Sequence, residues 1–275
     1  MVSRWSPMLV CAVVAVLGGG AAASAQEPQD LIVQSTTSVR DSGLLEQVII
    51  PDFQDQYPEW RLKVVAVGTG QAIANARAGQ GDVLITHSPA QEAKFVADGF
   101  SLEDEGRTVM WNDFVVVGPP GDPAGLARTQ SAAAAFKRIA AARAPFASRG
   151  DDSGTNAKEL KIWQSGGVTP RGSWYFKTGQ GMGETLTIAS QKGAYTLSDR
   201  GTFLATKGLQ SKILEQGDQA LQNYYHVIVV RHSGTNTACA NAFSNWITSP
   251  STQRVIGAFG REKYGRALFH PDAGS

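Results

Sequence analysis

An apolar, strand-like run that ends in small hydroxyl or glycine residues and then continues as a helical pattern occurs three times in this sequence. The three units are residues 31–33, 35–38 and 43–57; residues 62–67, 68–70 and 71–78; and residues 147–149, 151–155 and 157–164, the last without a strong preceding strand. Such a layout is typical of βα units in a parallel sheet. A buried strand over 82–87 and a helix over 92–98 are also predicted. The sequence therefore predicts an α/β protein.

Two further apolar runs, 114–117 and 226–230, bracket the middle of the chain. We interpret them as two crossings between lobes, because about 250 residues suffice for two lobes of roughly 120. The predicted division is a first lobe over 26–113, a second lobe over 114–226, and a return to the first lobe with C-terminal helices over 227–275. The expected architecture is two α/β lobes joined by a two-strand hinge.

Residues 1–25 have the organisation of a cleavable signal peptide. Arg4 is followed by an apolar run over 8–17 and by Ala23-Ser24-Ala25, which has the small-x-small pattern of a signal peptidase site. The apolar run is too short for a permanent membrane anchor. We therefore expect a mature protein that begins at Gln26 and is located in the periplasm.

The two cysteines bear on the same question. A lipoprotein is the alternative form of export, but Cys11 lies inside the apolar run without small residues before it. Cleavage would remove Cys11 and leave Cys239 alone, so no intramolecular disulfide is expected.

The charge balance limits the classes of partner. Removal of Arg4 from the 25 basic residues leaves 24, which equals the 24 acidic residues, so the mature chain is neutral. Nucleic acids and anionic membrane surfaces select a basic excess and are therefore not expected partners. An anion bound by this chain must be recognised by local groups.

The predicted turns carry such groups. A helix N-terminus presents unpaired backbone N–H groups and the positive end of the helix dipole, and hydroxyls add neutral donors. The hydroxyl residues at the three turns are Thr36, Thr37 and Ser38, then Thr69, then Ser153 and Thr155. At one turn alone, helix capping would explain them. Their recurrence at several strand ends favours a binding site for a small oxyanion, because ligands of open α/β folds collect at the carboxyl ends of strands.

Arg149 adds a directional charge to the third turn. A surface ion pair with Asp151 or Asp152 is one interpretation of this residue. The other is that its planar fork binds two oxygens of the anion while the aspartates orient the arginine or cap the helix. We favour the second, because the arginine adjoins a Ser-Gly-Thr cap.

Other motifs exclude several functions. The glycine-rich segment 178–184 lacks the spacing and the Lys-Ser/Thr ending of a phosphate loop, so nucleotides are not expected ligands. The four histidines show no metal-ligand spacing, and the chain lacks a Gly-x-Ser-x-Gly elbow. We expect no enzyme, no cofactor and no site for a free metal cation. A periplasmic hydrolase of phosphate or sulfate esters is the alternative from another class.

Several segments together resemble the tungstate-binding components of ABC importers. They are residues 35–38, 41–45, 64–72, 112–114, 148–155, 179–183 and 195–201, which cover nearly the whole mature chain in order. The resemblance implies a type II periplasmic-binding-protein fold whose lobes close on the anion and dock onto a permease in the inner membrane. Ser35 stands where the family pattern has threonine.

The resemblance also implies ligand residues. Arg149, Ser153 and Thr155 match the spacing of phosphate-binding relatives, and Ser38 and Thr69 match hydroxyl ligands of molybdate-binding relatives, which lack the arginine. Weaker transfers are Thr36, Thr37 and Gly183.

The implied ligand is tungstate or molybdate, with sulfate and phosphate as alternatives. Phosphate differs from the others because it carries a proton near neutral pH and benefits from a carboxylate acceptor. If the ligand is tungstate or molybdate, the protein binds the metal as an oxyanion and not as a free cation. A monomer is expected.

Overall fold

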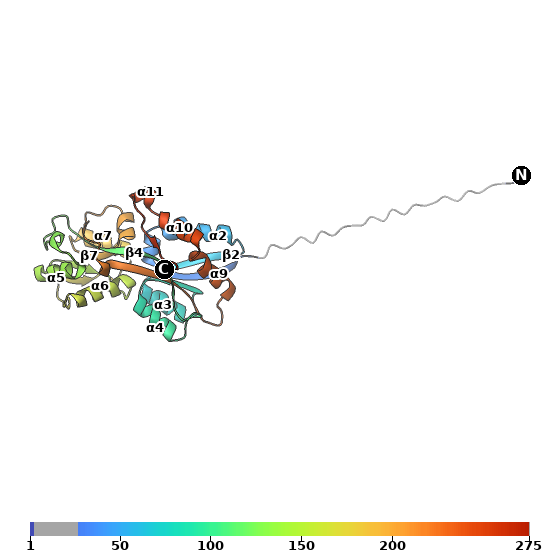
Figure 1. Ribbon diagram of the computed structural model, residues 1–275, viewed down its shortest axis with the longest axis horizontal. Helices are drawn as coiled ribbons and strands as arrows, with labels where there is room; N and C mark the ends of the chain where they lie inside the picture. The colour runs from blue at the N-terminus through green and yellow to red at the C-terminus, as the bar shows by residue number, and fades with distance from the viewer. Residues whose placement is uncertain (3–26, 275) are drawn as a thin grey trace.

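The computed structural model describes residues 1–2 and 27–274, so the predicted signal peptide beyond Val2 and the predicted mature start at Gln26 lie outside the described residues. Within the described part, no helix combines the length and the apolar character needed to cross a membrane. In Figure 1 the molecule has two lobes side by side, with α5, α6 and α7 in one lobe, α2, α9 and α10 in the other, and β4 between them.

The first lobe is built on a mixed sheet with the strand order β10-β4-β9-β3-β1-β2. The strands are β1 Gln29–Thr36, β2 Trp60–Val67, β3 Val83–Thr86, β4 Arg107–Gly118, β9 Gln222–Val229 and β10 His270–Pro271. β1 pairs in parallel with β2 and with β3, as expected for successive βα units. β9 is antiparallel to both β3 and β4. Parallel pairing brings the carboxyl ends of β1 and β2 to one edge of the sheet.

Strand β4 continues from the first lobe into the second. Up to Asp113 it pairs with β9, and from Phe114 it pairs with β7 (Thr196–Asp199). Its last residues also pair with β8 (Lys212–Glu215). The second lobe contains in addition the parallel pair β5 (Phe146–Ser148) and β6 (Tyr175–Lys177). The predicted two-strand connection between α/β lobes is thus formed by β4 and by β9, which follows the second lobe in the chain.

The strand pairing bears on where the lobes divide. The change of partner in β4 falls between Asp113 and Phe114. On the return, β9 pairs with first-lobe strands from Gln222 onward, ahead of the predicted division at 226. We propose lobe boundaries after Asp113 and before Gln222.

Helices cover the sheets of both lobes. In the first lobe they are α1 Thr37–Asp41, the π-helix η1 Leu45–Ile49, α2 Ile50–Gln56, α3 Thr69–Arg77, α4 Pro89–Ala97, α9 Thr237–Ile247, α10 Pro250–Ala258 and α11 Arg261–Tyr264. In the second lobe they are η2 Leu126–Arg128, α5 Ala132–Ala142, α6 Gly154–Ser165, α7 Met182–Gln191, α8 Arg200–Ala205 and η3 Gln219–Leu221. The helical pattern over 43–57 is divided between η1 and α2, and Pro51, which has no N–H to donate, lies where the π-helix passes directly into α2.

Strand alternation distributes the apolar residues over two faces of the sheet. Val227 and Val229 of β9 join one first-lobe core, while Ile228 joins another with Phe95 of α4. The same period divides the second-lobe part of β4, where alternate residues enter separate cores. Residues 114–117 of β4 and 227–229 of β9 are therefore buried on both faces of the sheet.

Candidate functional site

Three helices begin at the face between the lobes. α1 follows β1 directly, α3 begins two residues after β2 ends, and α6 follows the loop after β5. The Gly70 N–H at the start of α3 donates to the Asp152 carbonyl in the loop before α6, with a distance of 3.2 Å between N and O. The structure thus brings together the three turns that the sequence singled out.

Besides the Ser35 hydroxyl, four hydroxyls of predicted site residues at these turns are buried and have no hydrogen-bond partner among the described residues. They belong to Thr36, Ser38, Thr69 and Thr155, whose exposed fractions are 1%, 0%, 0% and 2%. A buried hydroxyl without a partner costs about 1–3 kcal/mol. Four such groups at adjoining helix N-termini form a set of donors suited to an anion.

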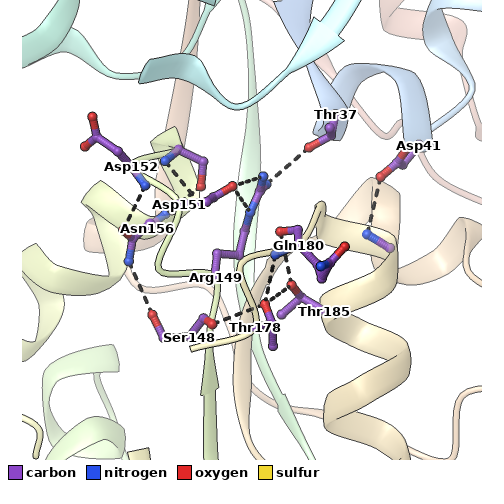
Figure 2. Close-up of polar contacts among 12 residues, drawn as sticks. Thr37, Asp41, Ser148, Arg149, Asp151, Asp152, Asn156, Thr178, Gln180 and Thr185 are labelled. Atoms are coloured by element: carbon purple, nitrogen blue, oxygen red, sulfur yellow. Dashed lines mark hydrogen bonds and ion pairs between the residues drawn. The ribbon is translucent and has the colours of Figure 1, made fainter. Parts of the chain in front are cut away.

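Arg149 is the cation of this region and is 3% exposed. Its guanidinium forms an ion pair with Asp151, in which Nη2 lies 2.6 Å from Oδ2. Nη1 reaches across to the first lobe and donates to the hydroxyl of Thr37 at 3.2 Å, as Figure 2 shows. The other oxygen of Asp151 accepts from the Ser153 N–H at 3.2 Å. Asp151 therefore orients the arginine and the turn, which is one of the two roles expected for it.

The remaining predicted site residues are already engaged within the protein. Ser153 is the N-cap of α6, and its hydroxyl oxygen accepts from the Asn156 N–H at 3.2 Å, which leaves the hydroxyl proton free to donate. The Gly183 N–H donates to Asp41 Oδ2 at 3.3 Å. Gly183 therefore joins the lobes through Asp41, and its N–H is not directed at the four unpartnered hydroxyls.

Close backbone approach explains glycine at two positions in the site. A Cβ at Gly70 would lie 2.6 Å from Asp152 Oδ2 and 2.8 Å from the Asp152 carbonyl oxygen. A Cβ at Gly154 would lie 2.6 Å from the His87 ring. Real Cβ atoms do not approach this closely, so both positions need glycine for the lobes to meet as they do here. The two lobes are therefore in direct contact at these turns.

Sequence reasoning did not single out Asp199 as a site residue, although it lies within one of the segments that carry the family resemblance. It is the last residue of β7 and is fully buried. Burial raises the pKa of its carboxyl to about 6, against the lowering effect of the hydrogen bond from the Thr202 N–H and of the nearby Ser38 hydroxyl. Nothing in its sequence pattern separates this residue from an ordinary helix cap, which it also is.

A buried polar group at the crossing strands was also missed. Asn112 of β4 and Asn223 of β9 face each other, and Asn223 Nδ2 donates to Asn112 Oδ1 at 2.7 Å. His87 Nδ1 lies 2.9 Å from Asn223 Oδ1, and the His87 ring stacks on Tyr225 with centroids 4.8 Å apart. Burial lowers the pKa of His87 to about 4, so the ring is neutral at physiological pH.

Glu159 of α6 accepts hydrogen bonds from side chains next to the turn that contains Arg149, including one at the end of β5. Its carboxylate accepts from the Ser148 hydroxyl at 2.6 Å, from Trp163 Nε1 at 2.9 Å and from the Tyr175 hydroxyl at 2.8 Å. Burial raises the pKa of this carboxyl, and the hydrogen bonds act in the opposite direction. Through these hydrogen bonds Glu159 links α6 to the ends of β5 and β6.

Titratable side chains do not assemble into a cation site in the described part of the chain. Over residues 1–2 and 27–274, no three residues among His, Cys, Asp and Glu come together in a way that would hold a metal ion. The site consists of neutral donors and one arginine, which is the chemistry of an anion site.

Comparison with known proteins agrees with this chemistry. A family model described as a PBP superfamily domain matches residues 21–251. The tungstate-binding protein TupA of Peptoclostridium acidaminophilum is 44% identical over 255 residues, which are 90% of this chain and 87% of that protein.

Two solved structures are similar along most of the chain. The tungstate ABC transporter from Geobacter sulfurreducens is 42% identical with a TM-score of 0.78, over 85% of this chain and 100% of the other. The tungstate-binding protein TupA from Desulfovibrio alaskensis G20 is 38% identical with a TM-score of 0.72, over 89% and 99%. These matches confirm the expected type II periplasmic-binding-protein fold. The chain belongs to the PBP superfamily and, within it, to the family of the tungstate-binding proteins TupA.

Proposed function

We propose that this protein captures tungstate between its two lobes and delivers it to an ABC importer. The observation that supports this most directly is the set of four buried, unpartnered hydroxyls at three helix N-termini around Arg149. A tetrahedral dianion accepts hydrogen bonds and donates none, so hydroxyls, backbone N–H groups and a guanidinium match it fully.

In the proposed mechanism, each lobe binds one side of the anion. Ser38 and Thr69 belong to the first lobe, and Arg149, Ser153 and Thr155 belong to the second. Closure would be a hinge motion in β4 and β9, the two strands that link the lobes. Thr36 and Thr37 would add hydroxyls from the first lobe, and Thr37 already receives a hydrogen bond from Arg149. Gly183 would act in closure through its contact with Asp41.

The proposed setting is the periplasm. There the mature chain, beginning at Gln26, would act as a monomer and present the closed form to a permease in the inner membrane. The names of the relatives support the link to a permease, since they are a tungstate-binding protein and a tungstate ABC transporter. We further propose that the protein is not an enzyme and needs no cofactor.

Selectivity among oxyanions follows from the donors. Molybdate is almost the same size as tungstate and is the nearest alternative ligand, while sulfate is smaller. Phosphate would need an acceptor for its proton, and the carboxylate of Asp151 is already engaged by Arg149 and by the Ser153 N–H. The donor set therefore favours unprotonated dianions over phosphate.

A thermal stabilisation screen tests the proposal. The protein is melted alone and with tungstate, molybdate, sulfate or phosphate. A ligand at one hundred times its Kd stabilises the folded state by about 2.7 kcal/mol and raises the melting temperature by several degrees. Tungstate should give the largest shift. Stabilisation by phosphate or sulfate alone would contradict the proposal, and turnover of an aryl phosphate or aryl sulfate ester would support the hydrolase instead.

Replacement of Arg149 by alanine tests the cationic half of the site. The change removes a buried charge-assisted donor, so isothermal titration should show tungstate affinity reduced about tenfold or more. An affinity within threefold of the wild type would remove Arg149 from the site. Arg143, an exposed arginine at the C-terminal end of α5, provides an alanine control outside the site.

A further inference from the structure

Asp199 is a buried carboxyl with one unused oxygen. It caps α8, where Oδ1 accepts from the Thr202 N–H at 2.8 Å. The other oxygen, Oδ2, is buried and has no hydrogen-bond partner among the described residues. A carboxylate in this position would be an uncompensated buried charge, which is a costly state.

The neighbour of this carboxyl is Ser38, one of the proposed anion donors. α1 and α8 pack together, and the Thr202 hydroxyl lies 3.5 Å from the Ser38 carbonyl oxygen. Ser38 Oγ is close enough to Asp199 to lower its pKa, but the two groups form no well-aligned hydrogen bond, and each is buried without a partner. Asp199 Oδ2 and the Ser38 hydroxyl are therefore neighbours, and neither has another hydrogen-bond partner among the described residues.

The charged groups around Asp199 do not neutralise it. Arg200, the next residue, directs its guanidinium to Asp113 and to Gln216. Asp41 of α1 raises the pKa of Asp199 by like-charge repulsion. In the described structure, no cation pairs with Asp199.

Tyr225 is a further titratable group that interacts with the Asp199 carboxyl. Tyr225 of β9 is buried, and its hydroxyl has no partner among the described residues. Burial raises the pKa of Tyr225 above its ordinary value, the charge of Asp199 adds to this, and Arg149 acts in the opposite direction. A neutral tyrosine cannot supply a proton at physiological pH, so Asp199 is the group here that can gain or lose one.

The chemistry of a serine hydroxyl links the acid to the anion. Ser38 has one proton to donate. If Asp199 is ionised, the carboxylate competes for that proton and repels a dianion. If Asp199 is protonated, it can donate to Ser38 Oγ, and the Ser38 proton is free for the anion. A carboxylic acid kept neutral in a buried site so that it can donate a hydrogen bond is a known device in enzymes.

We propose that this protein binds its oxyanion together with one proton on Asp199, with Ser38 as the link between the acid and the anion. This inference rests on the proposed function and adds to it that capture is coupled to pH. Asp199 acts as a positioning residue, since it directs the Ser38 hydroxyl and does not itself contact the anion.

Proton counting by calorimetry tests the inference. Sodium tungstate at micromolar concentration is titrated into the full mature chain at pH 7.5 in buffers of different ionisation enthalpy. Dilute tungstate stays a dianion at this pH, so any proton taken up goes to the protein. The expected result is an uptake approaching one proton per tungstate. Between pH 8 and pH 6 the affinity should rise by up to about tenfold per unit, and it should level off below about pH 6.

Two variants distinguish the proposed coupling between Asp199 and Ser38 from nonspecific effects of a substitution. Asp199→Asn keeps the cap and donates permanently from its amide, so it should bind tungstate at pH 8 as tightly as the wild type does at pH 6, without proton uptake. Ser38→Ala should lose both proton uptake and affinity. The control is Asp52→Asn on α2, a carboxyl outside the site whose pKa is also raised by burial, and it should take up protons as the wild type does.

The outcomes are distinguishable. Tungstate binding without proton uptake in the wild type would overturn the inference and leave the proposed function standing. Unchanged uptake in Asp199→Asn would also overturn it. A complete absence of tungstate binding would refute the proposed function and the inference with it. Absence of proton uptake in the wild type overturns the inference even if a variant does not fold.

Discussion

Thr69→Val should make the ligand-free protein more stable and the complex weaker. Thr69 is fully buried, and its hydroxyl has no partner among the described residues. Valine has nearly the same shape without the hydroxyl, so the change removes the cost of an unsatisfied buried group, about 1–3 kcal/mol. In a chain of this size each kcal/mol is about 2–4 °C in melting temperature. The melting temperature without ligand should rise by several degrees.

The same change should weaken tungstate binding. A hydrogen bond to a charged group contributes about 1.5–3 kcal/mol, which corresponds to an affinity about 10- to 150-fold lower. Thr86→Val is the matched control, because Thr86 is equally buried but its hydroxyl donates to Glu92 at 2.8 Å. The control should lower the melting temperature and leave the affinity unchanged. Differential scanning calorimetry and isothermal titration measure both effects. A destabilised Thr69→Val protein with wild-type affinity would refute the assignment of the four hydroxyls as anion donors.

Three further predictions concern closure, pH and support of the site. Gly70→Ala places a Cβ against Asp152, so tungstate affinity should fall at least tenfold at an unchanged melting temperature, whereas Gly121→Ala, with open space around it, should match the wild type by titration. His87 has its pKa lowered to about 4, below its unfolded value. The folded state therefore binds fewer protons, and His87 should cost stability as pH falls from 6.5 to 4, by up to about 3 kcal/mol. Urea unfolding should show this loss in the wild type and not in His87→Gln. Glu159→Gln should lower the free energy of unfolding by about 1–3 kcal/mol, because an amide cannot accept from all the donors around it. A urea midpoint equal to that of the wild type would contradict the prediction.

The sequence alone determined the local elements and much of the candidate site. The strands ending at Thr36 and Val67 and the helices after them follow from short-range periodicity and from the residues that begin helices. Parallel pairing places such turns at one edge, so recurrence of hydroxyls was enough to predict an oxyanion site there. Arg149 was visible for the same reason, since it lies within one of those turns.

Only the tertiary structure decided which polar groups from distant parts of the chain contact each other. Gly183 was predicted near the anion, yet its N–H is directed at Asp41, 142 residues away in the chain. Asp199 and Ser38 become neighbours only because α8 packs on α1. Burial, and with it the raised pKa of Asp199, depends on what the other lobe covers. Local periodicity contains no information on such distant contacts, whereas the direction of a side chain at the end of its own strand is set by a few adjacent residues.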